Sequence, residues 1–72
     1  MANSGETRAE DLVLLKLSDV MKRTTLSKAT VLRKVKEQNF PAPVKITEAR
    51  KAWVKSEVDA WIAGHVENRR SA

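Results

Sequence analysis

Two prolines separated by one residue divide this chain into two parts that fold differently. Pro41 and Pro43 lie in the segment Phe40-Pro41-Ala42-Pro43. A proline has no backbone amide to donate and favours extended geometry in the residue before it, so a helix cannot continue through this segment. We therefore expect any helix before the prolines to stop by Asn39, and the chain after them to begin as extended backbone.

The first part starts with a short apolar run, residues 12–17, which is typical of a brief extended segment lying on the core. Ser18 is then expected to cap a helix over residues 18–23. In that helix Asp19 would meet the positive helix N-terminus, and Val20 would face inward.

A second helix is predicted after a short break. Ser27 is expected to be its N-cap, and residues 28–37 contain neither glycine nor proline. At about 100° per residue, Val31 and Val35 fall on one side, and Arg33 falls on the other. The pattern predicts a helix with one core face and one basic face.

Beyond the prolines, alternating apolar and polar residues predict a hairpin of residues 44–46 and 51–54. Ser56 with Asp59 three residues later resembles a capping box that would open a closing helix. Trp53 in the hairpin and Trp61 in the helix both fall on core-directed positions. The apolar stripe of the closing helix comprises Val58, Trp61, Ile62, His65 and Val66.

These elements predict a mostly α-helical fold with a small β-hairpin, in the order of a winged helix-turn-helix. Its three helices and wing would occupy residues 12–67. Residues 1–11 are expected to be a mobile polar leader, and residues 68–72 a basic C-terminal tail.

Size and composition argue against several classes of protein. A chain of 72 residues has little room for a water-excluding catalytic pocket, so we expect no enzyme and no small-molecule substrate. With no cysteine and one histidine, it offers no disulfide framework and no zinc ligand set, so no metal or other cofactor is expected. Its apolar runs are far shorter than the roughly 20 residues that span a bilayer, and its first residues lack a signal peptide pattern. We expect a cytoplasmic protein without a membrane partner.

The positive charge is concentrated in the middle of the chain. Of the net charge of +5, residues 1–11 contribute −2, residues 12–55 contribute +8, and residues 56–72 contribute −1. Such a field favours a polyanion as partner. A lysine-rich surface that serves solubility alone is the alternative.

Four segments of the chain resemble the AlpA family of phage and prophage regulators, which are excisionase-like proteins with a MerR-type winged helix. The resemblance covers roughly residues 12–66. It implies a bacterial, nucleoid-associated DNA-binding protein that regulates transcription of mobile-element genes or acts as a recombination directionality factor beside an integrase. The segments are Leu14–Val20, Leu26–Val31, Phe40–Lys45 and Ala52–Ile62.

The resemblance also implies roles for individual residues. It places Ser27, Lys28, Thr30 and Arg33 on the recognition helix and makes residues 47–51 the wing turn. The family often has glycine at the start of that turn and arginine two residues later, where this chain has Thr47 and Ala49, with Arg50 one step further on. The candidate DNA-binding residues are Ser27, Lys28, Thr30, Arg33, Lys34, Lys36, Arg50 and Lys51.

Arg33 is the leading candidate, because a guanidinium can donate two parallel hydrogen bonds to guanine in the major groove. Its alternative is a solvated ion pair with Glu37, four residues later. Since one helix reads only a few base pairs, self-association on tandem DNA sites is also expected. For the whole chain, the competing interpretation is a small basic interaction module that docks on an acidic partner such as an integrase.

Overall fold

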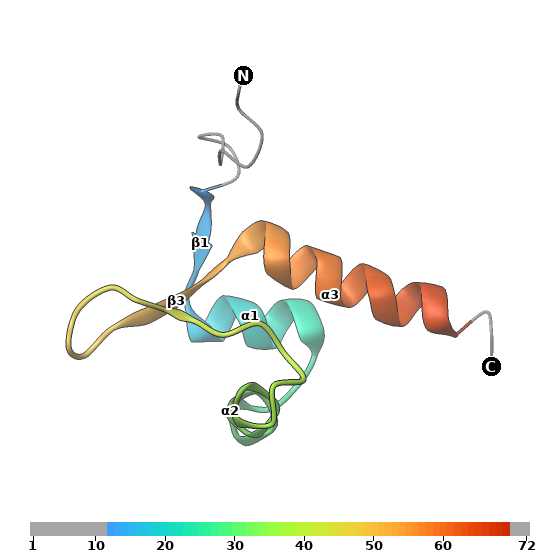
Figure 1. Ribbon diagram of the computed structural model, residues 1–72, viewed down its shortest axis with the longest axis horizontal. Coiled ribbons are helices and arrows are strands. Elements are labelled where there is room, and N and C mark those ends of the chain that lie inside the picture. Colours follow the sequence, from blue (N-terminus) through green and yellow to red (C-terminus); the bar gives the residue numbers. More distant parts are fainter. Residues whose placement is uncertain (1–11, 70–72) are drawn as a thin grey trace.

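The computed structural model describes residues 12–69, which form three helices and three short strands (Figure 1). The predicted fold class, three helices with a wing, is confirmed. The expected leader, residues 1–11, and residues 70–72 of the expected tail lie outside the described residues. In chain order the elements are β1 (Leu14–Leu15), α1 (Leu17–Thr24), α2 (Lys28–Lys36), β2 (Val44–Lys45), β3 (Lys51–Val54) and α3 (Lys55–Asn68).

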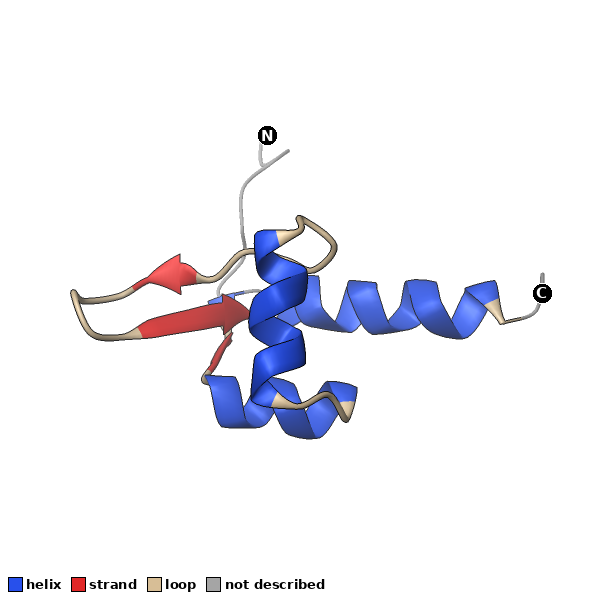
Figure 2. Cartoon of the chain, turned by 90° about the horizontal axis from the view of Figure 1, so that it is seen from below, coloured by secondary structure: helices blue, strands red, loops and turns tan. Residues whose placement is uncertain are grey.

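The strands form one antiparallel sheet with β3 in the centre, in the order β1-β3-β2. β2 and β3 are the predicted hairpin, and we call residues 44–54 the wing. It projects from one end of the domain (Figures 1 and 2). Leu15 pairs with Trp53, which puts both on the face of the sheet that meets the helices.

One hydrophobic core joins the sheet to all three helices. Each helix contributes one valine with no exposed surface: Val20 from α1, Val31 from α2 and Val58 from α3. Trp53 is only 2% exposed, which confirms its predicted core position. Trp61 packs against this core but is only partly buried.

Both tryptophans hold the proline segment in place. The indole Nε1 of Trp53 donates a hydrogen bond to the carbonyl of Pro41 at 2.9 Å. The indole Nε1 of Trp61 donates to the carbonyl of Asn39 at 2.8 Å. Between these anchors the buried Phe40 ring meets Trp61 edge to face, with ring centroids 4.9 Å apart. The segment that separates the two parts of the chain is thus fixed to β3 and α3.

Two of the three predicted helix starts are wrong. α1 begins at Leu17 with Lys16 as N-cap, so Ser18 lies inside the helix. Asp19 nevertheless acts at this end, since its carboxylate accepts from the Lys16 amide at 3.4 Å. By contrast, Ser27 caps α2 as expected: its hydroxyl accepts from the amide of Thr30 at 3.2 Å.

The predicted capping box at Ser56 is the second error. α3 begins at Lys55, directly after β3, and Val54 occupies the N-cap position. The Lys55 amide donates to the carbonyl of Val13 at 2.8 Å, which extends the pairing of β1 with β3 up to the helix start. Strand pairing thereby takes the place of a side-chain cap, and Asp59 is left to make other contacts.

The ends of α1 and α2 use residues with left-handed backbone. Thr25, between α1 and α2, has φ 63°, and its amide donates to the carbonyl of Met21 at 2.8 Å. Gln38, after α2, has φ 64°. α2 ends at Lys36 with Glu37 as its C-cap, in agreement with the expected stop by Asn39.

Candidate nucleic-acid interface

The helix α2 has one face in the core and one face uncovered by any other described element. It lies at the lower edge of the domain in Figure 1 and in front of the other elements in Figure 2. On its inner face Val31 is buried and Val35 is partly buried. We call the opposite side the outer face of α2; its exposed residues are Ala29, Leu32, Arg33, Lys36 and, just beyond the last turn, Glu37.

The start of α2 is held by its own hydroxyl groups. Besides accepting from the Thr30 amide, the Ser27 hydroxyl donates to the Thr30 hydroxyl at 3.0 Å. Both predicted site residues are therefore engaged in the cap. Lys28 follows them in the first turn with an exposed side chain.

Arg33 lies at the middle of the outer face, as predicted. Its side chain is 60% exposed, and its Nε is 3.9 Å from a carboxylate oxygen of Glu37, which is 50% exposed. The expected pairing with Glu37 is thus present, but a long, solvated pair of this kind contributes little free energy. The guanidinium keeps donors for another acceptor. Of the two neighbouring candidates, Lys36 is exposed and Lys34 is partly buried.

The wing turn is built around the side chain of Thr47. The Thr47 hydroxyl accepts from the amides of Ala49 at 3.2 Å and Arg50 at 3.0 Å. This side-chain turn replaces the need for a flexible residue. Arg50 and Lys51 follow it, both exposed. This role of Thr47 was not predicted from the sequence, although a threonine hydroxyl in a turn commonly accepts hydrogen bonds from nearby backbone amides.

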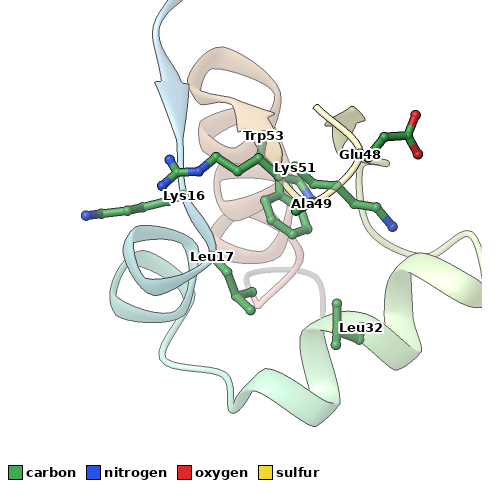
Figure 3. A pocket seen from close by; sticks show the side chains of 8 residues that line it. Lys16, Leu17, Leu32, Glu48, Ala49, Lys51 and Trp53 are labelled. Atoms are coloured by element: carbon green, nitrogen blue, oxygen red, sulfur yellow. The ribbon is translucent and has the colours of Figure 1, made fainter. Parts of the chain in front are cut away.

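A cleft of about 350 Å³ separates the wing turn from α2 (Figure 3). Leu32 from α2 and Leu17 from α1 point into it, with Ala49 and Trp53 above them in the view. Lys16 also lines it, although the sequence analysis did not select that residue. The remaining lining residues are Glu48, Arg50 and Lys51 of the wing. Two of the predicted site residues, Arg50 and Lys51 of the wing, therefore line the cleft, whereas α2 borders it through Leu32 and not through its predicted site residues.

Arg23 and Lys55 bind an acidic side chain away from the candidate interface. Asp59 of α3 accepts hydrogen bonds from Lys55 Nζ at 2.8 Å and from a guanidinium nitrogen of Arg23 at 3.1 Å. The hydrogen bond from Lys55, together with the charges of Lys55 and Arg23, holds the pKa of the Asp59 carboxyl below its ordinary value. This ion-pair cluster links α1 to α3 and leaves the candidate interface to the other cations.

The described part of the chain has neither a cluster of metal ligands nor a membrane-spanning helix. Among residues 12–69, no three histidine, cysteine, aspartate or glutamate side chains gather where they could hold a metal ion. None of the helices described is both long and apolar enough to cross a membrane.

Comparison with known proteins gives two matches. A family model described as prophage CP4-57 regulatory protein (AlpA) matches residues 13–66. The uncharacterized protein ORF88 of Enterobacteria phage P4 is 34% identical over 56 residues, which cover 78% of this chain. The chain spans 64% of the length of that phage protein, less than two thirds. No solved structure matches significantly.

Proposed function

This chain belongs to the AlpA family of prophage regulatory proteins, and from that premise we propose that it binds double-stranded DNA sequence-specifically. The observation that supports the proposal is that exposed basic side chains lie on both of the elements that border one cleft, α2 and the wing. The outer face of α2 is uncovered and carries Arg33 and Lys36, and the wing turn across the cleft carries Arg50 and Lys51. A duplex needs both kinds of contact, one with base edges and one with phosphates.

In the proposed complex α2 lies in the major groove, and the wing contacts the adjacent backbone or minor groove. Arg33 reads guanine, because its donors match the two acceptors of that base and its pairing with Glu37 is weak enough to exchange. Lys28, Lys34 and Lys36 neutralise phosphates along α2, where they add affinity more than specificity.

The remaining predicted residues take supporting roles. Ser27 and Thr30 fix the start of α2, where the remaining first-turn amides would donate to a phosphate in the complex. Arg50 and Lys51 bind the backbone from the wing. The stiff turn made by Thr47 supports this role, since it limits how far the wing tip can move when it meets the duplex.

The biological role that we propose is that of a recombination directionality factor, a transcriptional regulator, or both, for an integrative element. The protein would act in the bacterial cytoplasm, at the nucleoid, and an integrase would be a natural partner. Because α2 is short and reads only a few base pairs, self-association on tandem sites would supply the missing specificity.

Selection of bound duplexes from a random library tests the binding proposal directly. The parent should enrich one short motif, and its affinity for that motif should exceed its affinity for random duplexes by about a thousandfold or more. Uniformly micromolar or weaker binding at low salt, alongside tight binding to an acidic protein, would instead support the interaction module.

Mapping of the occupied sites on a host chromosome then tests the biological role. Tandem copies of the motif beside an attachment site indicate a recombination directionality factor. A lone copy at a promoter indicates a transcriptional regulator.

A further inference from the structure

One large apolar side chain lies on the outer face of α2 among cations. Leu32 is 44% exposed. Lys28 precedes it by four residues and Lys36 follows it by four, so both lie next to it on the helix surface. Arg33 is its immediate neighbour in sequence, and the exposed Ala29 lies one turn before it. The core does not need Leu32, because Val31 and Val35 already fill the inner face of α2.

Leu32 lines the cleft between α2 and the wing. Its side chain points into the cleft, which Leu17 and Ala49 also line (Figure 3). With 44% of its surface exposed, Leu32 presents an apolar surface beside the arginine.

In the major groove, thymine is the base that presents a methyl group. At the corresponding position cytosine has no methyl group, and the neighbouring edge atoms of the other bases are hydrogen-bond donors and acceptors. An apolar side chain at that place gains by burying the methyl group, whereas a polar edge placed against it would lose its hydrogen bond with water.

We propose that Leu32, with Ala29 beside it, is a specificity-determining residue that contacts the methyl group of a thymine. The inference rests on the DNA-binding function proposed above and identifies one base that the interface would recognise. Lys28 and Lys36 hold the phosphate backbone on either side, and Arg33 and Leu32, about 100° apart on the helix, address neighbouring base pairs. The site would therefore combine a guanine with an adjacent thymine.

Deoxyuridine provides the test, because it lacks only the methyl group of thymine. The probe is the highest-affinity duplex that the parent selects from a random library, synthesised with deoxyuridine in place of each thymine in turn. At one thymine position the parent should lose about fourfold in affinity, which is the loss expected when one buried methyl group is removed. Leu32→Ala should bind the thymine and deoxyuridine duplexes equally at that position.

Val66→Ala is the matched control, because Val66 is also 44% exposed but lies on α3. It should keep the parental preference for thymine. Leu32→Gln provides a second variant of similar length, and a thermal transition close to the parent's shows that each variant is folded.

The possible failures are distinguishable. If the parent selects a motif that depends on Arg33 but binds thymine and deoxyuridine duplexes equally at every position, the role of Leu32 is contradicted and DNA binding stands. The same holds if both Leu32 variants keep the parental preference. If no motif is selected at all, both the proposed function and this inference are contradicted.

Discussion

Val31 and Arg33 lie two residues apart on the same helix and meet opposite environments. Val31 has no exposed surface and packs with valines from the other two helices, whereas Arg33 is 60% exposed and makes one long ion pair. The inner face of α2 thus determines where the helix sits, and the outer face is available for a ligand. This separation means that stability and binding should respond to different substitutions.

The largest effect is expected in the core. Trp53→Ala removes a side chain that is 2% exposed, together with its hydrogen bond to Pro41, and should lower the free energy of unfolding by about 3 to 5 kcal/mol. A domain of this size has little more stability than that, so the variant should be largely unfolded. Thermal denaturation followed by circular dichroism measures the loss. Val66→Ala, an exposed control, should stay within about 0.5 kcal/mol of the parent, and a cooperative parental transition in Trp53→Ala would contradict the assigned core.

The outer face should show the converse behaviour. Arg33→Ala should melt like the parent but bind the selected motif about 1 to 3 kcal/mol more weakly, with a smaller loss on random duplexes. Arg33→Lys should recover only part of the loss, because an ammonium cannot form the two parallel hydrogen bonds. Fluorescence anisotropy with both duplexes gives the specificity ratio. Arg69→Ala, which removes an arginine just after α3, is the control. Equal losses on both duplexes would make Arg33 a phosphate contact.

Substitutions in the wing should reduce DNA affinity less than Arg33→Ala does. The reduction should be similar for every duplex sequence. Replacing Arg50 and Lys51 together by alanine should flatten the plot of log K against log salt by up to about two units, since each phosphate contact contributes about 0.9. The control pair, Lys22→Ala with Arg69→Ala, removes the same charge from α1 and from the residue after α3. An unchanged slope in the wing variant would show that the wing points away from the duplex.

The smallest effect concerns the ion-pair cluster of Asp59, which lies outside the proposed interface. Folding lowers the pKa of Asp59, so its carboxylate stabilises the fold at pH values above its unfolded pKa of about 3.9. This stabilisation is lost as the pH falls through the folded pKa. Its side chain and those of Arg23 and Lys55 are each 39% exposed, so Asp59→Asn should cost less than about 1 kcal/mol at neutral pH. Urea denaturation should show this difference shrinking as the pH falls below the unfolded value of about 3.9. Glu57→Gln, at an exposed acid of the same helix, should show no such convergence.

The features that could be predicted from sequence are those decided by nearby residues. Ser27 caps α2 because its partner amide is three residues away, and the alternating pattern on both sides of residues 47–50 predicts the hairpin. The pattern does not predict its burial, since Ala52 and Trp53 are both buried and Val44 and Ile46 are exposed. The separation of Val31 from Arg33 follows from helical periodicity alone. The exposed position of Arg33 on α2 was therefore predictable from the sequence.

The features that were missed depend on residues far apart in the chain. The expected cap at Ser56 fails because the amide of Lys55 pairs with Val13, which only the folded sheet brings near. Asp59 contacts Arg23 across 36 residues instead of closing a capping box. Lys16 joins the wing at the cleft for the same reason. Local patterns carry no information about such pairings until the topology is known.

The central claim is that the basic surfaces of α2 and the wing bind a duplex, and a salt titration of the parent tests it most directly. If about five phosphates are neutralised, log K for the selected duplex should fall with log salt at a slope near −4.5, which lowers the affinity by roughly two to three orders of magnitude between about 50 and 200 mM. A slope near zero, or weak binding to every duplex at the lowest salt, would contradict the account.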